Sequence, residues 1–161
     1  MGERSVAPAL VERARPFLQE GEEIKTAEVV VCVATAVGAR PRGVPGAPGA
    51  GLRVGGAVGN RLARMGAVKG ESDSIARSIP YQRGGIVLGV TERRVGLWSG
   101  PAMGEPAELW SAPREVVTRV QRRPRLQLLA RFRLHFADGS TAAFMTPKRA
   151  SIERLANLLG R

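Results

Sequence analysis

The strongest constraint on the fold is a two-residue alternation of apolar side chains that recurs through residues 86–145. Successive side chains of a β-strand point to opposite faces, so this period predicts strands with one buried face. Residues 86–90 and 95–98 are apolar runs on either side of Thr91-Glu92-Arg93-Arg94, which predicts a hairpin. The clearest strand covers 126–136, and its apolar face is Leu126, Leu128, Ala130, Phe132, Leu134 and Phe136.

Other segments complete a mainly β domain with a helix at each end. Asp138-Gly139 signals a tight turn, after which residues 141–145 return as a partner strand. Residues 24–37 and 115–120 read as further strands. Apolar stripes at helical spacing predict an N-terminal helix within residues 1–23, interrupted by Pro16, and a C-terminal helix over 151–159. We therefore expect an α+β protein with its single β-domain in residues 24–161.

A glycine- and proline-rich stretch interrupts this domain between residues 38 and 72. Dense glycine opposes regular structure, and no acidic residue occurs between Glu28 and Glu71. The stretch is predicted to be a flexible basic insertion outside the core. Ser72 or Asp73 is then expected to cap a short helix that ends before Pro80.

The charge of the chain points to an anionic partner. The 161 residues carry a formal net charge of +11, and the sequence pI is near 11.5. Charge of this size favours association with nucleic acid, acidic lipid or acidic protein, without identifying which. Almost all the cations are arginine, a bias that GC-rich coding can produce alone, although such coding does not account for the excess of cations over acids.

Three short motifs carry a resemblance to a known family. They are Gly21-Glu22-Glu23-Ile24 after the first helix, Leu88-Gly89-Val90-Thr91-Glu92-Arg93-Arg94-Val95 and Phe136-Ala137-Asp138-Gly139-Ser140. In this order the chain resembles small actinobacterial pleckstrin-homology-like (PH/GRAM-like) proteins. The resemblance implies a strongly bent, seven-stranded antiparallel sheet or barrel, capped at one end by the last helix. It also implies a binding module for lipids, peptides or proteins.

The phosphoinositide site of such domains is not carried over to this chain. Its usual signature places Lys and Arg at alternating positions on the first two strands and their loop. Here Lys25 precedes the loop and Arg40 and Arg42 lie in it, with nothing comparable on residues 29–37.

Arginine clusters are the candidate anion-binding residues. One group surrounds the strongest strand, and the other lies in the insertion; together they are Arg122, Arg123, Arg125, Arg131 and Arg133 with Arg40, Arg42, Arg53, Arg61 and Arg64. Guanidinium groups hold phosphate oxygens bidentately. The alternative is a charged sheet edge that discourages pairing with other strands. Residues 121–125 are predicted to be a basic turn.

Catalytic, cofactor and metal sites are not expected. His135 is the only histidine and Cys32 the only cysteine, so no cluster with metal-ligand spacing arises. His135 reads as a solvated strand residue and Cys32 as a core residue. The first residues lack the apolar core of a signal peptide, and the best apolar run, 29–37, is too short to span a bilayer. We expect a cytoplasmic protein. If its anionic partner is acidic lipid, it would attach peripherally to the inner face of the membrane.

Three functions stay open at this point. The first is a non-enzymatic module acting at an anionic surface, either acidic lipid or an acidic protein. The second is a nucleic-acid binder, although aromatic residues for stacking make up only 4% of the chain. The third is an assembly subunit that uses the glycine-rich segment. No small-molecule substrate is expected, and the oligomeric state is undetermined by the sequence.

Overall fold

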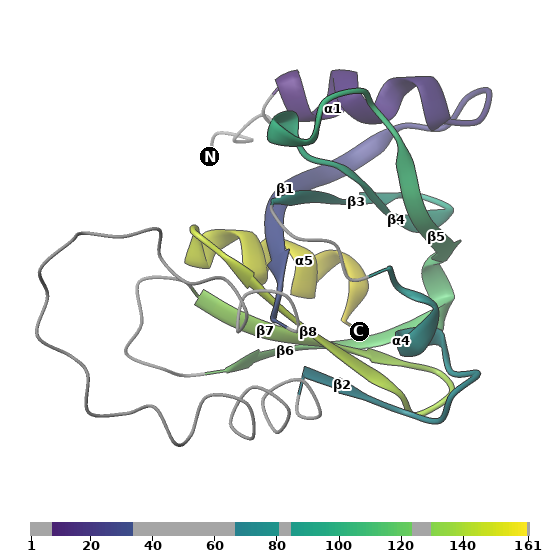
Figure 1. The fold of residues 1–161 in the computed structure, drawn as a ribbon, viewed down its shortest axis with the longest axis vertical. Coiled ribbons are helices and arrows are strands. Elements are labelled where there is room, and N and C mark those ends of the chain that lie inside the picture. Colours follow the sequence, from purple (N-terminus) through teal and green to yellow (C-terminus); the bar gives the residue numbers. More distant parts are fainter. Residues whose placement is uncertain (1–7, 34–66, 81–84, 124–129, 161) are drawn as a thin grey trace, which may run out of the picture.

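The computed structural model describes residues 8–33, 67–80, 85–123 and 130–160 (Figure 1). The strands are β1 (Ile24–Cys32), β2 (Val68–Lys69), β3 (Ile86–Thr91), β4 (Arg94–Ser99), β5 (Glu108–Pro113), β6 (Val117–Arg123), β7 (Ala130–Phe136) and β8 (Thr141–Thr146). The helices are α1 (Pro8–Ala14), α4 (Ile75–Ser78) and α5 (Arg149–Leu159), with short 3-10 turns η1 (Arg15–Phe17), η2 (Pro101–Met103) and η3 (Arg114–Val116). None of the helices in these ranges is long and apolar enough to cross a membrane.

The strands form one open antiparallel sheet, which confirms the predicted mainly β class with a helix at each end. Their order is β5-β4-β3-β1-β8-β7-β6, and β2 pairs with β8 beside this path. Strand β1 joins two halves of the sheet, because Ile24–Val30 pair with β3 whereas Val31 and Cys32 pair with β8. We call β5-β4-β3-β1 the first half and β1-β8-β7-β6 the second half. Figure 1 shows them diverging on either side of α5.

The main core lies between the inner faces of the two halves and α5. Phe132 and Leu134 of β7 are fully buried there, as the alternation predicted, and Cys32 is buried too. The ring of Phe132 stacks on that of Phe144, with centroids 5.7 Å apart. Helix α5 contributes three buried members of its predicted stripe, Ile152, Leu155 and Leu159.

A polar contact fixes α5 on this core. Glu28 of β1 is buried and accepts a hydrogen bond of 2.6 Å from the Ser151 hydroxyl. Arg154, one turn further along α5, donates to the other carboxylate oxygen of Glu28. A buried charge needs such partners, and here both partners come from the helix. The orientation of α5 against β1 is therefore specified by charge as well as by apolar burial.

Helix α1 packs on the outer face of the first half, so the hairpin β3–β4 is buried on both faces rather than on the single face that was predicted. Ala14 of α1 is fully buried against Val87 and Trp98. The Trp98 ring lies over Gly89 and Gly96, where an added Cβ would approach ring atoms to 2.4 Å and 2.5 Å. Pro16 ends α1 at Ala14 and leaves a separate 3-10 turn, as expected from its missing N–H.

The end of the predicted insertion belongs to the core. Ala67 and Val68 are buried and β2 pairs with β8, so the prediction that all of 38–72 lies outside the core is wrong for residues 67–69. Residues 34–66 lie outside the described part of the chain. Helix α4 follows as predicted, but its N-cap position is Ser74 rather than Ser72 or Asp73.

The cap of α4 comes from a distant hairpin turn instead. The backbone N–H of Ile75 donates to the Asp138 carboxylate at 2.7 Å, and that of Ala76 donates to the Ser140 hydroxyl at 3.0 Å. Asp138 also accepts from the Ser140 backbone N–H at 2.9 Å, which shapes the turn. The turn between β7 and β8 thus anchors the segment that leads into the first half of the sheet.

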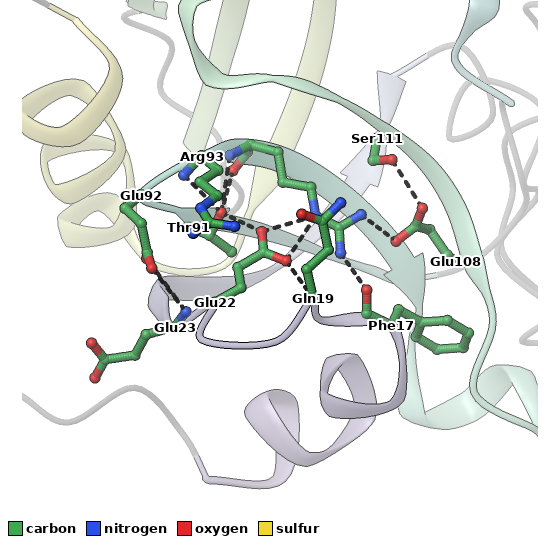
Figure 2. Close-up of polar contacts among 10 residues, drawn as sticks. Phe17, Gln19, Glu22, Glu23, Thr91, Glu92, Arg93, Glu108 and Ser111 are labelled. Carbon is green, nitrogen blue, oxygen red and sulfur yellow. Dashed lines mark hydrogen bonds and ion pairs between the residues drawn. The ribbon is translucent and has the colours of Figure 1, made fainter.

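A buried ion pair ties the segment after α1 to the β3–β4 turn (Figure 2). The side chain of Glu22 is completely buried and accepts hydrogen bonds from Arg94 Nε at 2.9 Å, from Thr91 Oγ1 at 2.6 Å and from the Gln19 backbone N–H at 2.9 Å. Arg94 also pairs with Glu108 of β5 at 2.9 Å. Burial acts to raise the pKa of Glu22, but these hydrogen bonds outweigh it and hold the pKa below its ordinary 4.5.

Replacement of Phe132 tests the main core. We expect Phe132→Ala to lower the free energy of unfolding by about 3–5 kcal/mol, because it removes a fully buried ring and leaves a cavity beside Phe144. The measurement is a urea unfolding curve. Arg122→Ala, at the exposed residue opposite Phe132 in register, is the control and should change little. A wild-type midpoint for Phe132→Ala would contradict this placement of the core.

Replacement of Glu22 tests the ion pair and its dependence on pH. The folded-state pKa is depressed, so the carboxylate contributes stability that is present above its unfolded pKa and is lost as the pH falls through the folded pKa. Glu22→Gln should therefore cost about 3–5 kcal/mol at pH 7 and progressively less below pH 4.5. Glu12→Gln, in an exposed pair with Arg15, is the control. A stability gap that stays constant down to acid pH would show that the Glu22 carboxylate is not the stabilising group.

Candidate anion-binding face

Cationic side chains gather on the outer face of the second half of the sheet. Residues opposite one another in an antiparallel pair project to the same face. The register pairs Arg119 with His135, Gln121 with Arg133 and Arg123 with Arg131; His135 is in turn opposite Thr141, which is opposite Lys69. We call the set Arg119, Arg123, Arg131, Arg133, His135 and Lys69 the cationic face.

A β-bulge in β6 produces this arrangement. Val117 is paired with Phe136 and Val120 with Leu134, so β6 has one residue more than β7 between these two core-facing pairs. The extra residue shifts the alternation, which places Arg119 opposite His135. Without the bulge, Arg119 and Arg123 would be in phase with Val117 and would face the core.

Arg133 lies at the centre of the cationic face and is itself buried, with only 8% of its surface exposed. Its Nη1 donates to the Thr141 hydroxyl at 3.1 Å, across the strand pair β7–β8. Burial, and then the positive charge of Arg123, lower the pKa of the Arg133 guanidinium. An arginine remains protonated at neutral pH, so Arg133 holds a charge in a poorly hydrated position beside other cations.

His135 is the titratable member of the face. The sequence predicted a solvated side chain, whereas His135 is half-buried. Its Nε2 donates to the Gln121 side-chain oxygen, 3.0 Å away. Burial lowers the pKa of His135 below its ordinary 6.5, and the charges of Arg119, Arg133 and Arg123 lower it further. The imidazole is therefore neutral at pH 7 in the absence of a bound anion.

The structure brings together only part of the predicted arginine set. Arg123, Arg131 and Arg133 share the cationic face. Arg122 is exposed but projects from the opposite face of β6, in register with Phe132. The prediction that residues 121–125 form a turn is wrong for 121–123, which belong to β6. The other predicted residues, Arg125, Arg40, Arg42, Arg53, Arg61 and Arg64, lie outside the described residues.

Three members of the cationic face were not among the predicted anion-binding residues: Arg119, His135 and Lys69. Arg119, Gln121 and Arg123 have the two-residue spacing of a strand face, which was a usable signal for Arg119. The predicted strand began at residue 115 and ended at 120, whereas η3 occupies 114–116 and β6 continues to Arg123. Lys69 enters the face only through the pairing of β2 with β8, for which its two-residue strand offers no sequence pattern.

A second candidate is a hollow between α1 and the start of β1. It has a volume of about 720 Å³ and is lined by Pro8, Val11, Glu12, Arg15, Leu18, Gln19, Glu22, Glu23 and Ile24. Its charged groups are already paired: Glu22 with Arg94, Glu12 with Arg15, and Glu23 with Lys25. Paired charges offer a ligand little net attraction, so the cationic face is the better candidate. Across the described ranges there is also no cluster of His, Cys, Asp and Glu that could hold a metal ion.

Comparison with known proteins adds no assignment. No protein-family model matches this chain, and a search of curated proteins gives no significant match.

The charge environment of His135 can be measured directly. Because Arg123 lowers the pKa of His135, Arg123→Gln should raise it, and the proton NMR signal of the single imidazole gives the pKa by titration. The matched control is Arg122→Gln, at the next residue but on the other face of β6. An equal pKa in the wild type and Arg123→Gln would contradict the placement of Arg123 on the same face as His135.

Proposed function

We propose that this chain is a non-catalytic, PH-like binding module that docks on an acidic phospholipid surface through the cationic face. The observation that carries the proposal is the register of β6, β7, β8 and β2, which collects four arginines, one lysine and one histidine on one side of a sheet. The bent antiparallel sheet and C-terminal helix support the PH-like part.

The arrangement of the faces favours a surface as the partner. Helix α1 packs on the outside of the first half, and α5 fills the inside of the sheet. The cationic face occupies the outside of the second half, with Arg119, Arg123 and Lys69 exposed. Cations spread over several strands attract an extended layer of negative charge, and each contributes about 1 kcal/mol near an acidic membrane.

The chemistry of the face favours binding over catalysis and lipid over nucleic acid. Arginine stays protonated at neutral pH, so it holds anions but does not exchange protons with a substrate. The rings of β7, Phe132 and Phe136, project into the core, and the in-register members of the face include no Phe, Tyr or Trp on which bases could stack. Peripheral attachment to the inner face of the cytoplasmic membrane is the location that this proposal implies.

Vesicle co-sedimentation tests the proposed function. The wild type should bind phosphatidylcholine vesicles only when phosphatidylserine is included, and binding should fall steeply as salt rises. Arg119→Gln/Arg123→Gln should lose about 2 kcal/mol, or roughly thirtyfold in affinity. The control is Arg93→Gln/Arg122→Gln, which removes two exposed charges away from the cationic face and should lose less.

Three outcomes would contradict the proposal. Equal losses in the two double variants would mean that only net charge matters. Absence of vesicle binding, together with a DNA gel shift that the Arg119→Gln/Arg123→Gln variant abolishes, would favour a nucleic acid on the same face. Absence of both, with self-association in light scattering, would favour an assembly subunit.

A further inference from the structure

The cationic face holds the only histidine of the chain. Histidine is the side chain whose charge ordinarily changes between about pH 5 and about pH 8. Cys32, the only cysteine, does not titrate in this range, because burial raises the pKa of its thiol to about 12. The side-chain charge that responds to pH near neutrality therefore lies within the cationic face.

The surroundings of His135 combine charged and neutral groups from several strands. Arg119 lies directly opposite it on β6, and the uncharged Thr141 lies opposite it on β8. The carboxylate of Asp138, which follows β7, accepts a hydrogen bond from the Ile75 backbone N–H of α4. The charged members of the face are Arg119 and Arg123 from β6, Arg131 and Arg133 from β7 and Lys69 from β2. Docking would place an anionic layer over a set of cations that surrounds this imidazole.

The hydrogen bond of the imidazole leaves one ring nitrogen open to a proton. Nε2 donates to the Gln121 side-chain oxygen at 3.0 Å. No described residue bonds to Nδ1, so this atom carries the lone pair that a proton from water would occupy. Protonation at Nδ1 keeps the bond to Gln121 and gives its donor a positive charge, which strengthens the bond. Proton uptake therefore requires no rearrangement of the strands.

We propose that docking on an acidic phospholipid surface is coupled to the uptake of one proton by His135, so that the cationic face binds the surface more tightly as the pH falls. The imidazole takes the proton from water at Nδ1 and becomes an imidazolium cation, and no other covalent bond is made or broken. The coupling rests on the proposed function, since it regulates the same face.

Two effects of docking act on this proton in opposite directions. The negative potential of an acidic membrane stabilises an added positive charge, and it acts over roughly a Debye length, about 10 Å. Removal of water from the imidazole disfavours the charged form. His135 is already half-buried, so docking removes little more water from it, whereas the membrane potential is entirely new. We therefore expect docking to raise the pKa of His135.

The direction of the pH dependence follows from linkage. Burial and the charges of Arg119, Arg133 and Arg123 hold the pKa of His135 below its ordinary 6.5 in the undocked protein. A group whose pKa is raised by docking adds affinity that is fully present below the undocked pKa and is lost as the pH rises through the docked pKa. One additional charge near an acidic membrane corresponds to about fivefold in affinity and to a pKa raised by about 0.7.

Vesicle co-sedimentation between about pH 8 and about pH 5 measures the coupling. Vesicles of phosphatidylcholine with phosphatidylglycerol are suitable, because the phosphodiester of phosphatidylglycerol keeps its single negative charge over this range. We expect the wild-type affinity to rise about threefold to fivefold as the pH falls. His135→Gln should show only the small rise that protonation of carboxylates gives, and the two proteins should bind equally at about pH 8.

A relocated histidine is the matched control. His135→Gln/Arg122→His keeps one histidine but moves it to the other face of β6, where Arg122 is in register with Phe132. Its rise in affinity should fall well short of the wild type. Circular dichroism at each pH checks that the variants stay folded.

NMR observes the proton directly in the wild type. We expect micelles of dihexanoylphosphatidylglycerol to raise the pKa of the single imidazole by about 0.7, relative to micelles of dihexanoylphosphatidylcholine. An unchanged or lowered pKa would overturn the coupling, and this measurement holds even if His135→Gln does not fold.

The outcomes separate the coupling from the proposed function. Vesicle binding with the same pH dependence in the wild type and His135→Gln would overturn the coupling and leave docking intact. Full wild-type pH dependence in the relocated variant would overturn it too, because total charge rather than the cationic face would then be responsible. Absence of binding to acidic vesicles at every pH would overturn docking, and the coupling with it.

Discussion

The buried pair between Glu22 and Arg94 is the contact on which the arrangement of the first half depends. It joins the segment before β1 to the β3–β4 turn and, through Glu108, to β5. Arg94 also donates to the Phe17 carbonyl in the turn after α1. A charge removed from water must be satisfied in a specific geometry, so one arginine sets the positions of four segments. Glu22 and Arg94 both lie in the motifs that carry the family resemblance. Their part in stabilising the fold accounts for their presence there without any ligand.

The faces of the sheet differ in what they carry. Strand β1 supplies partners to both halves, and its buried Glu28 orients α5 within the bend. Helix α5 covers the inner face of the sheet with apolar side chains, and α1 covers the outside of the first half. The outside of the second half is where cations collect. The residues of the proposed binding face are therefore held on strands whose opposite sides pack largely on the core, and this rigidity suits a face that would keep like charges close together.

Local apolar patterns were enough to predict the terminal helices, the buried face of β7 and the described strands other than β2, because residues such as Phe132 and Leu134 obey a local period. They could not predict contacts that depend on pairing. The cap of α4 comes from Asp138 and Ser140, more than sixty residues away. Arg133 is buried, whereas the sequence alone showed only a charged residue on a polar face. Half of the candidate site was therefore visible as arginines, but their grouping was not.

The bulge in β6 decides which face of the sheet the arginines of this strand occupy. Every residue after it is displaced by one step of the pleat, so its position decides whether the arginines of β6 meet solvent or the core. If β6 kept all its residues but paired with β7 without the bulge, Arg119 and Arg123 would be in phase with Val117 and face the core, and Val120 would face outward. In this fold the electrostatics of an entire surface depend on one residue of β6 that has no counterpart on β7.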